Sequence, residues 1–177
     1  MKTATLPKQL DLRGLAARGA TVSGTVAPGE LPRLDEAGVV LAEPLMASFS
    51  LRRDENSRSV VAAEVKATLT MQCQRCLGEV SVPLSTSSTM ACVWTDDESA
   101  SLPAFYEPLI VADEAVLRDI VEEEILLALP SFPTHETECK TREQFAALKP
   151  LNALSDEVAE VSGQTDSPFG VLEQLKN

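Results

Sequence analysis

The clearest hydrophobic pattern in the chain is a strict alternation over residues 61–73, with the sequence VAAEVKATLTMQC. Apolar side chains occupy every second position from Val61 to Cys73, and mostly polar side chains lie between them. A period of two is typical of a β-strand with one face in a core and the other in solvent. The pattern predicts a long strand whose last inward-facing residue is Cys73.

Shorter alternating segments lie on both sides of this strand. Residues 20–26 and 45–53 alternate before it, and a polar turn at 54–57 leads into it. After a turn that contains Gly78, residues 80–84 and 85–95 predict two further strands. The middle of the chain is therefore expected to be an antiparallel sheet.

The period changes to that of a helix over residues 113–129. Asp113 is the expected N-cap, Pro130 follows the end, and the run Glu122 to Glu124 is expected on a solvated face. Shorter helices are predicted at 11–19, with Asp11 as N-cap and Gly19 as its end, at 141–149, and at 167–177.

These elements predict an α+β fold, built as an antiparallel sheet or a partly open barrel with one main helix near 113–129. A length of 177 residues fits one ordinary domain with appended termini. We expect a domain over residues 1–149, an acidic flexible linker over 150–166, and a short C-terminal docking helix over 167–177.

Charge is distributed unevenly along the chain, whose net charge is −12. Residues 1–90 contain 10 Lys or Arg and 9 Asp or Glu, whereas residues 91–177 contain 5 and 18. The acidic half suits a basic protein partner, although acidity can also serve solubility alone. RNA could contact only the N-terminal half, through a set of candidate cations: Arg52, Arg53, Arg58, Lys66 and Arg75. Alternatively, these cations belong to a solvated face of the sheet and bind no RNA.

No apolar run of about 18 residues is present, and the start MKTATLPKQLDLRG has no apolar segment typical of a signal peptide. We therefore expect a cytoplasmic protein without a membrane partner. In that compartment the four cysteines are expected to be reduced.

The Cys-x-x-Cys pair Cys73 and Cys76 has three interpretations. A redox dithiol needs its first thiol at a helix start, whereas here a strand leads into the pair. A structural zinc site needs two more ligands, and His135 with Cys139 has a suitable spacing. Buried free thiols are the third interpretation, which the inward parity of Cys73 and the apolar neighbours of Cys92 favour.

No catalytic motif is present in the sequence. The single histidine has no nucleophile motif around it, and neither a glycine-rich phosphate loop nor an HExxH motif occurs. We therefore expect a protein that is not an enzyme. An RNA-processing enzyme with unrecognised catalytic groups and a thiol-redox regulator using Cys73 and Cys76 are the alternatives.

Four segments together resemble the YceD family of large ribosomal RNA subunit accumulation proteins. They are CQRCLGEV, LPAFYEPLIV, LRDIVEEEILLALPSFPTH and SPFGVLEQLK. The resemblance implies a bacterial cytoplasmic, non-enzymatic factor that supports 23S ribosomal RNA accumulation, through its synthesis, processing or assembly. Other branches of the family look richer in cysteine at the position of His135 and Cys139, which suits a metal site that this chain either keeps only in part or has lost.

Overall fold

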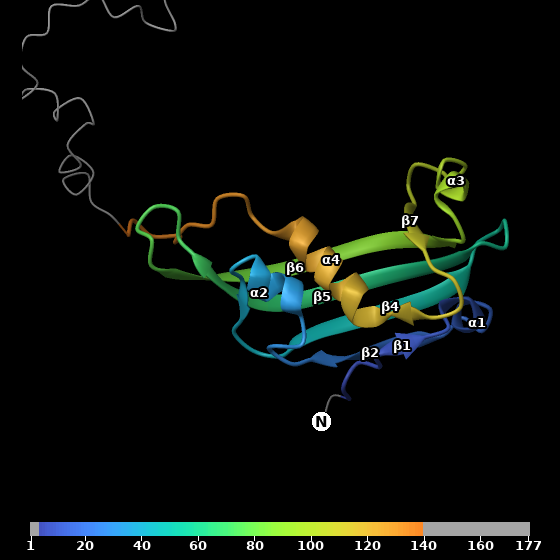
Figure 1. The fold of residues 1–177 in the computed structure, drawn as a ribbon, viewed down its shortest axis with the longest axis horizontal. Coiled ribbons are helices and arrows are strands. Elements are labelled where there is room, and N and C mark those ends of the chain that lie inside the picture. Colours follow the sequence, from blue (N-terminus) through green and yellow to red (C-terminus); the bar gives the residue numbers. More distant parts are fainter. Residues whose placement is uncertain (1–3, 140–177) are drawn as a thin grey trace, which may run out of the picture. The chain divides into compact units, whose positions relative to one another are not determined.

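The computed structural model describes residues 4–139, and its main feature is an open six-stranded sheet (Figure 1). The strands lie in the order β2-β4-β5-β6-β7, and β3 also pairs with β5. This confirms the predicted α+β class. The bounds are β2 (Thr21–Val26), β3 (Val40–Leu41), β4 (Leu45–Arg53), β5 (Ser59–Gln72), β6 (Glu79–Val93) and β7 (Glu107–Ile110).

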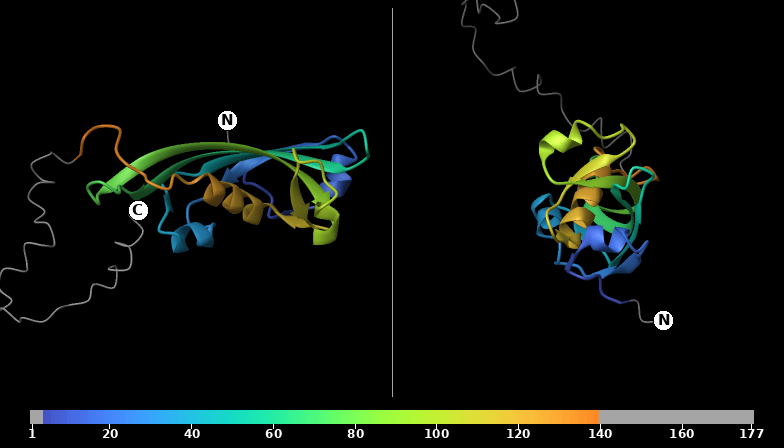
Figure 2. Two further views of the ribbon diagram at one scale, coloured as in Figure 1. Left: turned by 90° about the horizontal axis from the view of Figure 1, so that it is seen from above. Right: turned by 90° about the vertical axis from the view of Figure 1, so that its right-hand side faces the viewer.

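Helices cover one face of this sheet. Figure 2 shows α2 and α4 on the same side of the long strands, and the opposite face of the central strands carries exposed Glu64 and Lys66. A second, two-stranded sheet joins β1 to β8. The remaining bounds are β1 (Gln9–Leu10), α1 (Leu12–Ala16), α2 (Pro32–Glu36), α3 (Asp96–Ser99), β8 (Ala115–Val116) and α4 (Leu117–Ala128).

The central strand β5 follows the alternation in the sequence. Val61, Val65 and Leu69 are buried, because this face of the sheet packs under the helices. β5 pairs with β4 on one side and with β6 along nearly its whole length on the other. The predicted strand is confirmed, and Cys73 is buried immediately beyond its end.

The strand β6 is continuous, although two strands were predicted over residues 80–95. Its pairing with β5 runs without a break from Glu79 to Ala91, through Pro83. Proline is tolerated in an edge strand, and β7 pairs with β6 only over residues 90–93. The β7 strand is parallel to β6, so the sheet is mostly rather than wholly antiparallel.

The main helix begins four residues later than predicted. Ala115 and Val116 pair with β1, so α4 starts at Leu117, and Asp113 is not its N-cap. Along α4 the side chains of Leu117, Val121 and Ile125 are fully buried against the sheet. The prediction for the first helix is closer, because the Asp11 carboxylate accepts a hydrogen bond from the Gly14 amide.

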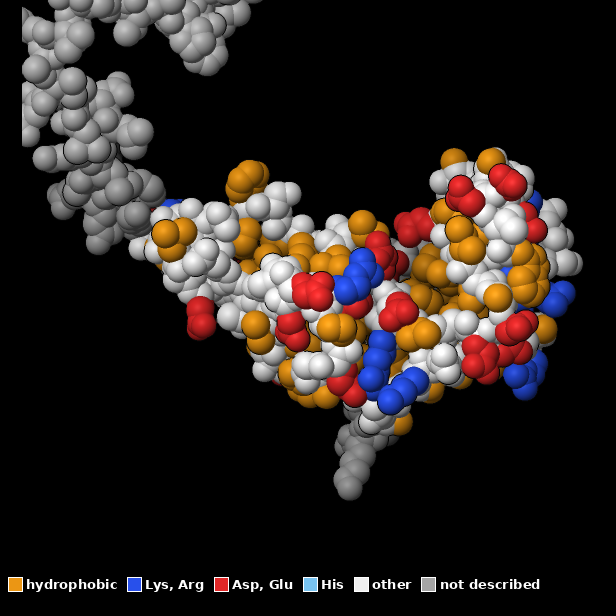
Figure 3. Space-filling view, in the orientation of Figure 1, with side chains coloured by type: hydrophobic (Ala, Val, Ile, Leu, Met, Phe, Trp, Pro, Cys, Tyr) orange, Lys and Arg blue, Asp and Glu red, His pale blue; other side chains and the backbone are white. Residues whose placement is uncertain are grey.

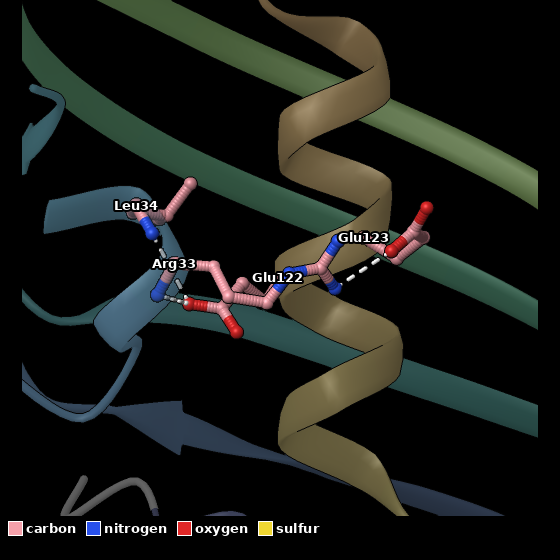
Figure 4. Close-up of polar contacts among 4 residues, drawn as sticks. All are labelled: Arg33, Leu34, Glu122 and Glu123. Carbon is pink, nitrogen blue, oxygen red and sulfur yellow. Dashed lines mark hydrogen bonds and ion pairs between the residues drawn. The ribbon is translucent and has the colours of Figure 1, made fainter. Parts of the chain in front are cut away.

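Two of the three glutamates expected in solvent are buried. Glu122 is only 3% exposed, and its Oε1 accepts hydrogen bonds from the backbone amides of Arg33 (2.6 Å) and Leu34 (3.2 Å) (Figure 4). Glu124 is 6% exposed and accepts a hydrogen bond from the Ser88 hydroxyl at 2.6 Å. Only Glu123 is exposed, and it pairs with the Arg33 guanidinium.

Glu122 thus caps a helix that the sequence did not predict. The N-cap residue of α2 makes no side-chain hydrogen bond of its own, so the Arg33 amide depends on α4 for its acceptor, while the Leu34 amide donates both to Glu122 and to the Leu31 carbonyl. Helix α2 in turn inserts Leu34 into the core. A polar contact between two helices therefore holds part of the apolar core in place.

The predicted helices at 141–149 and 167–177 and the linker at 150–166 lie outside the described residues and stay predictions. Within residues 4–139, no helix is long and apolar enough to cross a membrane.

We predict that Glu122→Ala lowers the free energy of unfolding by about 1–3 kcal/mol, because it leaves the partly buried Arg33 amide without an acceptor and leaves the Leu34 amide with only the Leu31 carbonyl. The matched control Glu123→Ala removes an exposed ion pair and is expected to cost less than about 1 kcal/mol. Urea unfolding of both variants measures the difference. If both variants lost the same free energy of unfolding, the Glu122 cap would contribute no more to stability than the exposed ion pair of Glu123.

Candidate metal centre

The β5–β6 hairpin ends in a tight turn that contains Cys73 and Cys76. The Cys73 amide donates to the Gly78 carbonyl at 2.8 Å, and the Leu77 amide donates to the Cys73 carbonyl at 2.9 Å. The Arg75 amide points at the Cys73 sulfur, 3.4 Å away. This turn presents both thiols on the same side, as a metal knuckle requires.

Leu77 occupies a conformation in this turn that favours glycine. Its φ is +64°, and its side chain is 64% exposed. A left-handed residue with a Cβ costs on the order of 1 kcal/mol. The turn keeps this conformation because the Leu77 amide and the adjacent Gly78 carbonyl both bond to the Cys73 backbone.

The chain returns to this turn after α4. The Gln74 amide donates to the Pro133 carbonyl at 2.8 Å, and the Arg75 guanidinium donates to the Thr137 carbonyl at 3.2 Å. These contacts join the hairpin tip to residues 133–139. They bring His135 and Cys139 to the thiols of the turn.

The four predicted ligand residues form one cluster. Their ligand atoms all lie within 4.8 Å of one another. The Cys76 sulfur is 3.6 Å from His135 Nδ1, and the Cys73 and Cys139 sulfurs are 3.7 Å apart. A tetrahedral ion with bonds of about 2.3 Å to sulfur and 2.0 Å to nitrogen needs edges of roughly 3.5–3.8 Å. The cluster therefore has the dimensions of a four-coordinate metal site.

His135 is oriented for this role by its second ring nitrogen. Nε2 lies 2.8 Å from the Glu79 carbonyl, which can only accept a hydrogen bond. The proton is thereby assigned to Nε2, and Nδ1 presents its lone pair to the thiols. Metal-binding histidines commonly have such a partner, which fixes the ring and its tautomer.

Electrostatics of the thiols also favour a cation. Burial by itself raises the pKa of Cys73, but hydrogen bonds from the amides of Cys76, Arg75 and His135 lower it to about 5. The pKa of Cys139 is raised by burial and by the adjacent Cys76 and Cys73. A bound cation would relieve the repulsion among thiolates, so that metal binding would release protons from the cluster.

Comparison with known proteins identifies the family of this chain. The family model "Large ribosomal RNA subunit accumulation protein YceD" matches residues 61–176. This chain belongs to the YceD family. A relative in Haemophilus influenzae, named large ribosomal RNA subunit accumulation protein YceD, is 30% identical over 99% of both chains. No solved structure matches the chain.

The YceD family match includes both halves of the cluster. Cys73 and Cys76 lie near its beginning, and His135 and Cys139 lie well within its second half. The fourth cysteine, Cys92, is separate: it is buried on β6 near the opposite end of the hairpin and is not a member of the cluster. Burial raises the pKa of the Cys92 thiol, although Arg13 opposes the shift.

The structure does not bring the five candidate RNA-binding cations into one patch. Arg52, Arg53 and Arg58 flank the β4–β5 turn, where Arg58 pairs with Asp54 at 3.4 Å. Arg75 lies at the other end of β5, a strand of 14 residues that spans roughly 45 Å. Lys66 is exposed between these two ends. RNA contact stays a prediction for these residues.

Sequence reasoning missed the groups that support the cluster of Cys73, Cys76, His135 and Cys139. The Glu79 and Pro133 carbonyls orient His135 and the turn, and backbone atoms leave no signal in residue types. The glycine-like conformation of Leu77 is hidden in the same way, because a leucine rarely marks a left-handed residue.

We expect the purified protein to bind about one Co²⁺ per chain, with the absorption bands of a tetrahedral thiolate site. His135→Ala should weaken binding at least about tenfold, since it removes one of four ligands. Cys92→Ala, which removes a thiol outside the cluster, should bind like the unaltered protein. Spectroscopic titration separates these outcomes, and equal binding by both variants would rule out the proposed ligand set.

Proposed function

We propose that this chain supports accumulation of large-subunit (23S) ribosomal RNA as a non-enzymatic assembly factor in the cytoplasm, with a structural zinc ion in the Cys73, Cys76, His135 and Cys139 cluster. The observation that carries the proposal is the YceD family match, which includes all four ligand residues.

The donor set favours zinc in a structural role. Three thiolates and one imidazole are typical ligands of Zn²⁺, and four protein ligands leave no open position for substrate or water. The ion would tie the hairpin tip to residues 133–139. The ion would thus hold the structure together at this end of the sheet and would not take part in a reaction.

The low pKa of Cys73 is also found in redox thiols, but its context differs from theirs. In redox Cys-x-x-Cys motifs a helix start lowers the pKa of the first thiol. Here a strand precedes Cys73, and the hydrogen bonds to its sulfur come from the amides of the turn and of His135. The presence of His135 and Cys139 beside the pair makes metal binding the better account.

The proposed partner is a basic protein, such as a ribosomal protein or a processing factor. Residues 91–139 contain 12 Asp or Glu and one Lys or Arg, so the acidic character of the second half belongs largely to the described part of the chain. Opposite charge accelerates and selects such partners. Ribosomal RNA would be reached through the N-terminal half.

In a strain that lacks this protein, the ratio of large-subunit to small-subunit ribosomal RNA should fall. The unaltered chain and Cys92→Ala should restore the ratio, whereas Cys73→Ser combined with Cys76→Ser should not, because it removes half of the metal cluster. Quantitative RNA electrophoresis gives the ratio, and immunoblotting confirms equal protein levels. Full rescue by the double variant at normal level would contradict a role for the cluster.

The non-enzymatic character can be tested directly. We expect the zinc-loaded protein, incubated with precursor ribosomal RNA and Mg²⁺, to leave the RNA intact on a denaturing gel. Cleavage that copurifies with the protein and is lost in a Cys73→Ser variant would instead support an RNA-processing enzyme.

A further inference from the structure

Residues 94–114 follow the end of β6 and expose large apolar side chains among acidic ones. Trp94 is 53% exposed, Phe105 71% and Ile110 55%. The segment contains six Asp or Glu and no Lys or Arg. Figure 3 shows hydrophobic and acidic side chains interspersed over the end that carries α3 and β7. We call this the 94–114 surface, defined by Trp94, Asp96, Asp97, Glu98, Phe105, Glu107, Ile110, Asp113 and Glu114.

Each of the two exposed aromatic rings of this surface, Trp94 and Phe105, contacts another side chain. The Arg13 guanidinium lies 3.9 Å from the centre of the Trp94 ring and donates to the Val111 carbonyl at 2.9 Å. The Phe105 ring packs 4.4 Å from the ring of Tyr106, which is buried. Aromatic groups that are already fixed lose little entropy on binding, and they are typical anchors of protein interfaces.

A hollow of about 300 Å³ lies beside Trp94. Its lining includes three carboxylates, from Asp11, Asp113 and Glu114, and one cation, Arg13. Arg13 is engaged by backbone carbonyls and by the indole ring. Asp11 already accepts a hydrogen bond from the Gly14 amide, so Asp113 and Glu114 are the carboxylates that an incoming ammonium or guanidinium group would meet beside Trp94.

We propose that the 94–114 surface binds a basic segment of a partner protein. A Lys or Arg side chain would enter the hollow beside Trp94, and apolar side chains of the same segment would pack on Phe105 and Ile110. The proposal rests on the proposed function, because it locates the binding site for the basic partner assigned there.

Charge favours a basic protein segment over a second copy of the chain or RNA as the ligand of the 94–114 surface. A second copy of the chain would bring like charges together, and RNA would meet the same acidic side chains. The β4–β5 turn at this end of the sheet does carry Arg52 and Arg53, so RNA is the occupant that the experiment has to separate from a basic peptide.

The experiment uses the full chain and a fluorescein-labelled peptide of repeated Arg-Leu-Lys-Gly units. We expect saturable binding by fluorescence anisotropy, weakened by added salt, together with a change in protein emission. The chain has a single tryptophan, so emission excited selectively at tryptophan reports on Trp94 alone. A peptide with Glu in place of Arg and Lys, and a single-stranded RNA, should leave the emission unchanged.

Matched variants locate the binding site. Asp113→Asn with Glu114→Gln should weaken peptide binding about fivefold or more, since two carboxylates lose their charge. Glu36→Gln with Glu64→Gln removes the same charge from exposed positions elsewhere and should have less than about a twofold effect. Phe105→Ala should weaken binding, and Leu127→Ala, which truncates another exposed apolar residue, should not.

Absence of peptide binding, equal losses in both charge variants, or an RNA-induced change in Trp94 emission would each overturn the proposal. A shift of the unaltered chain to dimers that Phe105→Ala abolishes would also overturn it, in favour of a second copy. None of these outcomes tests the proposed function, because the ribosomal RNA ratio in the deletion strain is measured without the peptide.

Discussion

The rest of the structure depends on the pairing of β5 with β6. This ladder runs from Val60 opposite Ala91 to Gln72 opposite Glu79 in one unbroken register. Because side chains alternate with a period of two, a slip of one residue would turn the apolar face of β5 to solvent. The same register that buries Val61 and Val65 also sets the parity of Cys73 at the tip. One strand register therefore determines both which side chains enter the core and where Cys73 lies.

Helix α4 links that ladder to the other elements. It packs its apolar face on β5 and β6 and uses two buried carboxylates at its centre, one for α2 and one for β6. Neither Glu122 nor Glu124 has a cation among these hydrogen-bond partners, so amides and hydroxyls satisfy them. The helix also runs toward the hairpin tip and returns the chain there (Figure 1).

The features that sequence predicted are those that local patterns encode. The period of β5, the Asp11 cap and the ligand spacing of His135 and Cys139 are all readable over a few residues. The missed features depend on contacts distant in sequence: the cap of α2 comes from Glu122, and the start of α4 is set by pairing with β1. The burial of Glu124 depends likewise on a hydroxyl of β6. Residue type alone cannot report such partners.

The two halves of the metal cluster are separated by 58 residues along the chain, counted between Cys76 and His135. An ion held by both halves would act as a reversible crosslink that closes a long loop, and such closure restricts the unfolded chain more than the folded one. By mass action, each tenfold rise in free ion above the dissociation constant would add about 1.4 kcal/mol to stability. The amount of folded protein in a cell would then follow the supply of that ion.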